Sequence, residues 1–368
     1  MIDNHSLKLL NVGCGSTFHK AWVNIDINSI HEEIINVDIR KGLPFEESSF
    51  DVVYSSHVLE HFSIQDGLSL LNEIYRVLRP NGIVRIVVPD LENITRNYLS
   101  SLDRVKEYES KENVFNYEWM HMEMYDQTTR SISGGKMGNK MLDLTNGFDF
   151  MFERIGYEMF NAQERELINK LSSIQMEKSI YIFGAGTFGQ RIEKILSKHS
   201  VYINGYIDNS TSLIGQLVDN FLVNSLYNIS KSAHIIIAST WWREIEAQLK
   251  EHDFTNYYIV KTEVEKVSVP DGKLEEVREY IQTQLGMDYL RAFDEGVFRN
   301  QGEIHRQMYD QYLLKRTLLK TGFVNVTKMN ALESTIPNFG EYQLDEINGK
   351  VRKPDSLFME ATKKIKRR

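Results

Sequence analysis

The chain has a single cysteine, Cys14, and only 6 prolines among its 368 residues. One thiol cannot form an internal disulfide, and no cysteine and histidine spacing resembles a structural zinc site. No apolar run approaches the roughly 20 residues of a membrane span. The first six residues also lack the pattern of a signal peptide. These absences predict a cytoplasmic protein without an integral membrane segment.

Basic residues are in the minority, because 43 Lys and Arg stand against 51 Asp and Glu, for a net charge of −8. Nucleic-acid binding depends on clustered basic side chains, so we expect no nucleic-acid partner. The exception is the tail KKIKRR at 363–368. We interpret it as a solvated terminus, with weak contact to an anionic membrane surface as the alternative.

Three sequence blocks follow one another near the N-terminus: LKLLNVGCGS at 7–16, WVNID at 22–26, and LPFEESSFDVVYSSHVLEHF at 43–62, which runs into LNEIYRVLRPNGIVRIVVPD at 71–90. In the first block, apolar residues 7–12 predict a strand that ends in a glycine turn, where missing side chains let the backbone approach a ligand. In the third, residues 50–55 predict a buried strand with a polar rim at its carboxyl end, where open α/β sheets bind ligands. A helix closed by RPNG at 79–82 and a strand at 83–88 complete the pattern.

Together the blocks resemble the class I S-adenosylmethionine (SAM) methyltransferases, which have a Rossmann-like α/β sheet and a helical cap. The resemblance implies that the glycine turn contacts the methionine end of SAM and that Asp26 accepts hydrogen bonds from both ribose hydroxyls. Asp38 occupies the position of an acidic residue near the adenine. The predicted cofactor-binding residues are Asn11, Gly13, Cys14, Gly15, Asp26, Asp38, Ser55 and Ser56. Asn11 lies where the family more often has an acidic residue.

The connections between the first strands are unusually short. Only residues 16–21 separate Gly15 from the strand at Trp22, and about seven residues separate Asp26 from the third strand. Parallel strands normally need a crossover of about a dozen residues or more, so we expect the first two crossover helices to be vestigial. This resembles a methyltransferase subgroup with a Gly-Trp-x-Asn-x-Asp signature, here AWVNID at 21–26, that is linked to surface polysaccharide biosynthesis.

Residues 91–160 are expected to form a helical cap. Polar residues gather there in one short stretch, Tyr125, Asp126, Gln127 and Arg130, and they are our candidates for acceptor binding. The alternative is that this segment is packing, since Met and aromatic stripes are more often core than site.

Residues 178–262 predict a second Rossmann-like unit. A strand at 179–183 leads into GAGTFG and an amphipathic helix, and Asp208 follows about 20 positions later, as in the dinucleotide-binding fingerprint. Gly184, Gly186, Gly189 and Asp208 form a tentative second nucleotide site, for NAD or a nucleotide-sugar. The unit resembles small Rossmann-type domains attached to sugar-modifying enzymes. Alternatively, the glycines only close a tight turn, because a fold does not establish a function.

The C-terminal part predicts a helix after residue 310, a strand at 323–326 and another at 356–361. A helix followed by a final hairpin is how the same methyltransferase fold ends. We therefore expect a methyltransferase domain in two parts, residues 1–164 and 271–368, interrupted by an inserted domain at 165–270. Such insertions succeed at exposed loops.

For the chemistry, SAM presents a reactive methyl group, so positioning of a small acceptor is most of the task. A hydroxyl acceptor must lose its proton, and histidine suits that role near neutral pH. His57 is the first candidate for the base, followed by His305 and His121, while His61 is interpreted as structural. No metal is expected. The predicted function is methyl transfer to a sugar or nucleotide-sugar-like acceptor; the alternative is a catalytically silent sensor or scaffold that binds SAM or a nucleotide.

Overall fold

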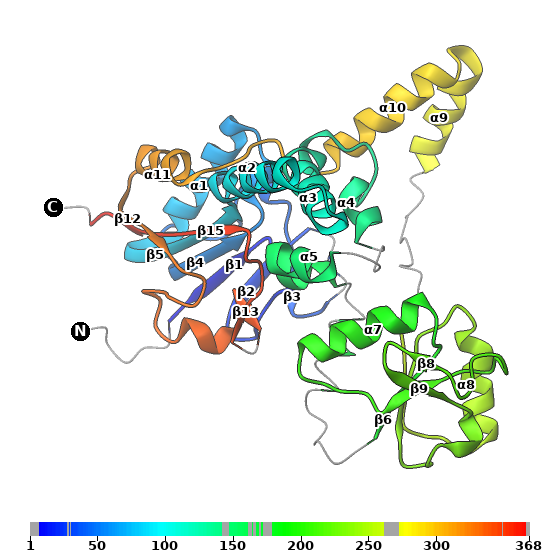
Figure 1. Cartoon of the computed structure of the whole chain (residues 1–368). Coiled ribbons are helices and arrows are strands. Elements are labelled where there is room, and N and C mark those ends of the chain that lie inside the picture. The colour runs from blue at the N-terminus through cyan, green and yellow to red at the C-terminus, as the bar shows by residue number, and fades with distance from the viewer. Residues whose placement is uncertain are drawn as a thin grey trace. The chain divides into compact units, whose positions relative to one another are not determined.

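The computed structural model describes residues 7–27, 29, 31–141, 147–160, 164, 167–168, 171, 179–260, 272–347 and 349–365. The chain divides into two compact units (Figure 1). Unit 1 comprises Met1–Met159 and Gly272–Arg368, and unit 2 comprises Phe160–Asp271. Of the residues at the predicted domain boundaries, only Glu164 lies within the described part, and residues 165, 270, 271 and the end of the basic tail at 366–368 lie outside it.

Unit 1 contains a seven-stranded sheet in the order β12-β15-β5-β4-β1-β2-β3. Its strands are β1 (Leu9–Val12), β2 (Val23–Asp26), β3 (Ile34–Asn36), β4 (Phe50–Ser56), β5 (Leu78–Pro89), β12 (Phe323–Met329) and β15 (Ser356–Lys363). The first five are parallel, and β15 runs antiparallel to both β5 and β12. The strand order reverses direction between β1 and β4, which is where sheets of this class bind ligands.

One face of this sheet is covered by α1 (Ile64–Val77) and α11 (Gln311–Lys320). Buried residues of α1 recur at helical spacing, Leu70, Leu71, Ile74 and Val77, and Ser63 caps the helix by accepting from Asp66 N. The prediction that RPNG at 79–82 closes α1 was wrong by a few residues, because the helix ends at Val77 and β5 begins at Leu78. The turn-forming residue Asn81 keeps a positive φ of 65° inside this irregular start of β5.

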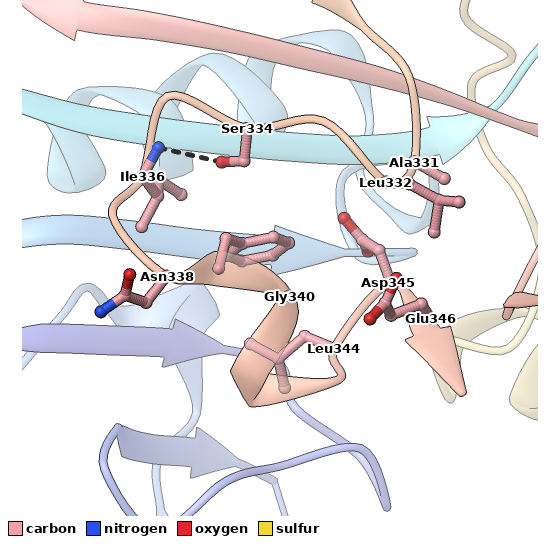
Figure 2. Close-up of a pocket in the computed structure, with 10 residues that line it drawn as sticks. Ala331, Leu332, Ser334, Ile336, Asn338, Gly340, Leu344, Asp345 and Glu346 are labelled. Carbon is pink, nitrogen blue, oxygen red and sulfur yellow. Dashed lines mark hydrogen bonds between the residues drawn. The ribbon is translucent and has the colours of Figure 1, made fainter. Parts of the chain in front are cut away.

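The other face is covered by an irregular segment, residues 331–344, in place of crossover helices. No helix joins β1 to β2 or β2 to β3 in the described residues, as predicted from the short connections. Trp22 and Tyr54 pack edge-on or tilted against Phe339 of this segment, with ring centroids 6.4 and 5.6 Å away. Figure 2 shows Ser334 within the segment accepting a hydrogen bond of 3.0 Å from Ile336 N.

The helical cap consists of α2 (Leu91–Glu107), α3 (Lys111–Thr129), α4 (Gly135–Lys140), α5 (Phe148–Ile155) and the 3-10 helix η3 (Gly156–Met159). Asp90 caps α2 and Ser110 caps α3 through side-chain oxygens. A buried ion pair of 2.6 Å joins Arg154 of α5 to Glu123 of α3. Two further helices, α9 (Gly272–Gln284) and α10 (Met287–Asn300), precede α11. No helix in the described ranges combines the length and hydrophobicity needed to cross a membrane.

Unit 2 contains a six-stranded sheet in the order β11-β10-β6-β7-β9-β8, with α7 (Thr187–Lys198) and α8 (Trp242–Glu251). Its strands are β6 (Ile180–Phe183), β7 (Gly205–Ile207), β8 (Leu217–Val218), β9 (Phe221–Asn224), β10 (His234–Ile237) and β11 (Tyr257–Ile259). All pairings are parallel except β8 with β9. The β8–β9 hairpin was not predicted, although Asp219 and Asn220, both at positive φ, are typical of its turn.

Candidate active site

The glycine turn after β1 exposes its backbone at the carboxyl edge of the unit 1 sheet. Gly13 N and Cys14 N donate to Ile25 O at 2.9 and 3.1 Å. A side chain at Gly13 would meet Val58 Cγ2 at 2.4 Å, whereas one at Gly15 would meet no described atom within 4 Å. The turn is therefore closed toward the core and open on the side of Gly15, where a ligand can approach.

Asp26 holds this turn in place from the end of β2. Its Oδ2 accepts from Gly15 N at 2.6 Å, and its Oδ1 accepts from Ile27 N at 2.7 Å. Each carboxylate oxygen can accept more than one hydrogen bond, so capacity for a ligand hydroxyl remains.

Three other predicted cofactor residues are buried around the turn. Asn11 Nδ2 donates to Thr17 O and Asn24 Oδ1, and its buried Oδ1 has no hydrogen-bond partner among the described residues. Ser55 Oγ donates to Val12 O at 3.1 Å and so ties β4 to the end of β1. Burial, together with the charge of Asp26, raises the pKa of the Cys14 thiol to about 12. Cys14 is thus a small buried residue and a poor nucleophile.

The remaining two predicted cofactor residues, Asp38 and Ser56, lie on the rim and accept hydrogen bonds from arginines. Asp38, just after β3, accepts from Arg40 Nε at 2.7 Å, and this hydrogen bond lowers the pKa of Asp38 to about 2. Ser56 Oγ accepts from Arg352 Nη2 at 3.0 Å. The eight predicted residues thus lie on β1 and β4 or at the ends of β1 to β4.

A cavity of about 260 Å³ opens beyond the ends of β4 and β5 in unit 1. It brings together two of the three histidines predicted to be catalytic and two of the four residues predicted to bind the acceptor. It is lined by His57, Glu60, His61, Pro89, Gln127, Arg130, Gly134, Met137, Met141, Ile155, Glu158, Glu303, His305, Lys353 and Asp355. A smaller cavity of about 160 Å³ lies under residues 331–346 (Figure 2), but its Asp345 is already paired with Arg85 at 2.7 Å.

His57 adopts a left-handed backbone conformation, with φ of 54°, directly after β4. Such strain persists only where the surroundings enforce it, and it is common at functional sites. The ring Nε2 lies 2.8 Å from Ser356 Oγ, and Nδ1 lies 3.2 Å from Glu60 Oε1. Burial, and then the charges of Lys353 and Arg352, lower the pKa of His57 well below its ordinary value. The imidazole is therefore neutral near pH 7, the form in which a ring nitrogen can accept a proton, and it is a weaker base than an ordinary histidine.

The other predicted residues divide into those that line the cavity and those that do not. His305 and Gln127 line the cavity, where His305 N donates to Gln127 O at 2.9 Å. His121 and Tyr125 do not line it: they lie one turn apart on the exposed face, with ring centroids 5.4 Å apart. Successive turns of a helix repeat every 3.6 residues, so these two share a face that Gln127 does not.

Asp126 and Arg130 also differ in what they contact. Asp126 is buried away from the cavity and accepts from Lys136 N and Met137 N at 2.8 and 3.3 Å, which caps α4. Arg130 lines the cavity and pairs with Glu303 at 3.4 Å. Of the four polar residues of this stretch, Gln127 and Arg130 thus line the cavity, and Tyr125 and Asp126 do not.

Apart from Arg130, sequence reasoning missed the Lys, Asp and Glu residues of the cavity. Lys353 Nζ lies 2.6 Å from Glu158 Oε1, and burial lowers the pKa of this lysine. Burial raises the pKa of Glu60 to about 8 and that of Asp355 to about 7. The one local signal was Glu60 itself, a charged residue within the apolar stretch VLEHF.

The glycine turn of unit 2 is built in the same way. Gly184 N donates to Ile207 O at 2.8 Å, and Ala185 N donates to Asp208 Oδ2 at 3.0 Å. A side chain at Gly189 would lie 1.8 Å from Gly184 O, so this position requires close helix and strand packing. A side chain at Gly186 would meet no described atom within 4 Å.

Comparison with known proteins gives two family matches. Residues 17–86 match the family described as Methyltransferase domain, and residues 176–260 match the family described as C2185-like, N-terminal. An uncharacterized protein of Haemophilus influenzae is 31% identical over 90 residues, which cover 23% of this chain and 36% of that protein. The chain thus spans about a third of the length of this curated relative.

Similar solved structures include a SAM-dependent methyltransferase from Mesorhizobium loti, with 18% identity, a TM-score of 0.20, and coverage of 26% of this chain and 51% of that one. Another is a SAM-dependent methyltransferase from Aquifex aeolicus, with 16% identity, a TM-score of 0.19, and coverage of 24% and 58%. The family match at 17–86 lies on the part of unit 1 that holds Asp26, β3 and β4. Within unit 1, residues 17–86 thus match a methyltransferase domain family, and the strands of unit 1 form a Rossmann-like α/β sheet.

Proposed function

We propose that this protein is a SAM-dependent methyltransferase acting on a small hydroxylated acceptor, a sugar or nucleotide-sugar used in surface polysaccharide biosynthesis. The observation that carries the proposal is the position of the cavity. It begins at the carboxyl ends of β4 and β5, on the same edge of the parallel sheet as the open glycine turn and Asp26. A donor on the turn and an acceptor in the cavity would thus share one edge.

The residues present fit SAM. The open side of Gly15 offers backbone that a side chain would obstruct, and the Asn11 Oδ1 is a buried acceptor without a described partner. The glycine turn would hold the methionine end and Asp26 the ribose. When bound, SAM supplies a methyl group activated by its sulfonium. The protein must then hold the acceptor oxygen in line with the methyl carbon and the sulfur.

His57 is the proposed proton acceptor. With SAM bound, the acceptor hydroxyl would lose its proton to His57 as the methyl group passed from the sulfur to the acceptor oxygen. A neutral imidazole can take that proton, and both ring nitrogens of His57 face polar groups, Ser356 and Glu60, that an acceptor would displace. Gln127 and Arg130, which line the same cavity, are proposed to bind acceptor oxygens.

A nucleotide-sugar is favoured by a second hollow in unit 1. His305 also borders an open groove of about 1040 Å³, whose lining includes Arg299 and Arg306. Guanidinium groups bind phosphate oxygens well. The sugar would lie in the cavity, and the diphosphate would lie in the groove beside these arginines.

The test is a transfer assay with the full chain and SAM against a panel of sugars, UDP-sugars and GDP-sugars. We expect methylation of a nucleotide-sugar, with a higher KM in Arg306→Ala and an unchanged KM in Arg243→Ala, an arginine of unit 2. Calorimetry would separate binding from chemistry. A protein that binds SAM but methylates nothing in the panel would instead be the sensor or scaffold that is the alternative function.

For unit 2 we propose a nucleotide site, for NAD or a nucleotide-sugar, over Gly186. Support comes from the free space at Gly186 and from its position as the N-cap of α7, where a phosphate is favoured. Thermal shifts of the full chain with each nucleotide test it. Gly186→Val should abolish the shift and leave SAM affinity unchanged, whereas no shift with any nucleotide would mean that the turn only closes the fold.

A further inference from the structure

Glu60 is a buried carboxylate without the hydrogen bonds that such a group needs. It lies in the 3-10 helix η2 (Leu59–His61), is 0% exposed, and neither of its oxygens has a hydrogen-bond partner in the described part of the chain. Its Oε1 is 3.2 Å from His57 Nδ1, but this contact lacks hydrogen-bond geometry. A buried acidic group normally requires a cation, hydrogen bonds or a metal.

Two imidazoles lie beside this carboxylate. The rings of His61 and His305 are 4.9 Å apart and nearly perpendicular. His61 Nδ1 lies 3.2 Å from Ile304 O, so Nδ1 carries the proton and Nε2 keeps a free lone pair. His305 is 7% exposed, and its Nδ1 has no hydrogen-bond partner among the described residues. Metal-binding histidines characteristically donate their other N–H to a backbone carbonyl, as His61 does.

We propose that Glu60, His61 and His305 bind a divalent transition-metal ion of the zinc type in the cavity. One ligand atom from each lies within 4.8 Å of the other two. Metal–ligand bonds of about 2.0–2.2 Å allow separations of at most about 4.4 Å between two ligand atoms, so a pair near the outer limit of this range would have to close by a few tenths of an ångström on binding. Two imidazoles and one carboxylate select zinc or a similar first-row ion over Mg²⁺ or Ca²⁺.

The ion pairs around the cavity leave Glu60 available as a ligand. Its lining includes four carboxyl groups, Glu60, Glu158, Glu303 and Asp355, and two cationic side chains, Arg130 and Lys353. The cationic groups are occupied, because Lys353 pairs with Glu158 and Arg130 pairs with Glu303. Glu60 is left without a cationic partner at ion-pair distance among the described residues, apart from the neutral ring of His57. An ion bound at Glu60 would therefore break neither of these two ion pairs.

Three protein ligands leave at least one coordination position open, as in catalytic metal sites. That position would face the cavity and bind an oxygen of the acceptor. A coordinated hydroxyl loses its proton more readily. This role in the reaction rests on the proposed function, whereas binding of the ion itself does not.

The experiment uses the full chain, treated with a chelator and then titrated with Co²⁺ or Zn²⁺ alone. We expect one equivalent of bound metal and a Co²⁺ absorption spectrum of nitrogen and oxygen ligation. Glu60→Gln, His61→Ala and His305→Ala should each weaken binding at least tenfold. Matched controls are Glu251→Gln and His252→Ala, a neighbouring Glu-His pair in unit 2, which should bind as the unchanged protein does.

The proposal would be overturned if the unchanged protein bound no stoichiometric metal. It would also be overturned if the three ligand variants bound the metal as tightly as the unchanged protein. A Co²⁺–thiolate band would also overturn it, since it would place the ion at Cys14. Circular dichroism shows whether each ligand variant folds. If one does not, X-ray absorption of the Zn²⁺-loaded unchanged protein tests the site instead. Fewer than two imidazoles bound to the zinc would rule the site out. SAM calorimetry on the same samples reports separately on the proposed function.

Discussion

Both units of this protein have a glycine turn held by a carboxylate at the end of their first strand. Only in unit 1 does a described cavity lined by histidine and acidic side chains lie at the same edge of the sheet. In unit 1 the carboxylate of Asp26 accepts from Gly15 N, and in unit 2 the carboxylate of Asp208 accepts from Ala185 N. Both turns include a glycine beside open space, Gly15 and Gly186.

The difference lies in what covers the strand ends. In unit 1, two C-terminal segments bring His305 and Lys353, and the helical cap brings Gln127, to the cavity that His57 and Glu60 line from the loop after β4. Among the described residues, the group that could hold a metal ion also lies in unit 1. A glycine turn with its acidic partner is therefore a way to build a strand-to-loop junction, and the surrounding elements decide whether it serves catalysis.

The largest effect is expected from replacing His57, the proposed base. His57→Ala should lower turnover by about 10²–10⁴-fold while SAM affinity stays within twofold, because general base catalysis acts on the acceptor and not on the donor. Initial rates and calorimetry measure the two quantities. His252→Ala, in unit 2, is the control. Normal turnover in the His57 variant would exclude this histidine as the base.

The thiol of the unit 1 turn offers a reporter that unit 2 lacks. Since the pKa of Cys14 is raised to about 12, its reactive thiolate is scarce at pH 8, and modification should be roughly 10³-fold slower than for an ordinary cysteine of pKa about 8.5. The rate should rise as pH increases toward 12. Labelling with a chromogenic disulfide over a pH series measures it. Rapid labelling at pH 8 in the folded protein would contradict the buried position.

Glycine substitutions separate packing from ligand access in unit 2. Gly189→Ala places a carbon 1.8 Å from Gly184 O and should destabilise unit 2 by about 3 kcal/mol. Gly186→Ala meets nothing within 4 Å and has an ordinary φ of −76°, so it should be neutral or stabilise by up to about 1 kcal/mol. Denaturant unfolding followed by hydrogen exchange in β6 measures both. Equal stability of the two variants would contradict the packing argument.

Removing the carboxylate of each turn should have different effects on the affinity for SAM. Asp26→Ala removes the proposed ribose acceptor and should cost about 1.5–3 kcal/mol of SAM binding, or roughly ten- to 150-fold in Kd. Asp208→Ala removes the equivalent carboxylate of unit 2 and should leave SAM affinity unchanged. Calorimetry on both variants is the comparison. Equal affinities for SAM would remove the cofactor assignment from Asp26.

The smallest effect is expected from removing unit 2 altogether. Replacing residues 160–271 by a short Gly/Ser linker should change SAM affinity by less than about twofold, because every proposed SAM contact lies in unit 1. Calorimetry of the shortened protein tests this. A product that is folded by circular dichroism but no longer binds SAM would show that unit 2 takes part in the cofactor site.

Local patterns were sufficient for most of the strands and for both glycine turns. The strand at β1, the glycine turn and Asp26 lie within 20 residues, and a change from apolar to glycine-rich sequence identifies them directly. The α7 helix and β6 were predicted in the same way. The β8–β9 hairpin was missed because its strands are only two and four residues long and so show little alternation.

The sequence by itself determined the fold class, the glycine turns and their acidic partners, because each depends on residues close together in the chain. Only the tertiary structure decided which polar residues meet. Glu60 and His305 come from distant segments, and their shared burial depends on how α10 and the cap return to the ends of β4 and β5. The same holds for α3, where a spacing of six residues puts His121 and Gln127 about 120° apart around the helix axis. Side-chain direction there is determined by packing against the rest of unit 1, which no local pattern encodes.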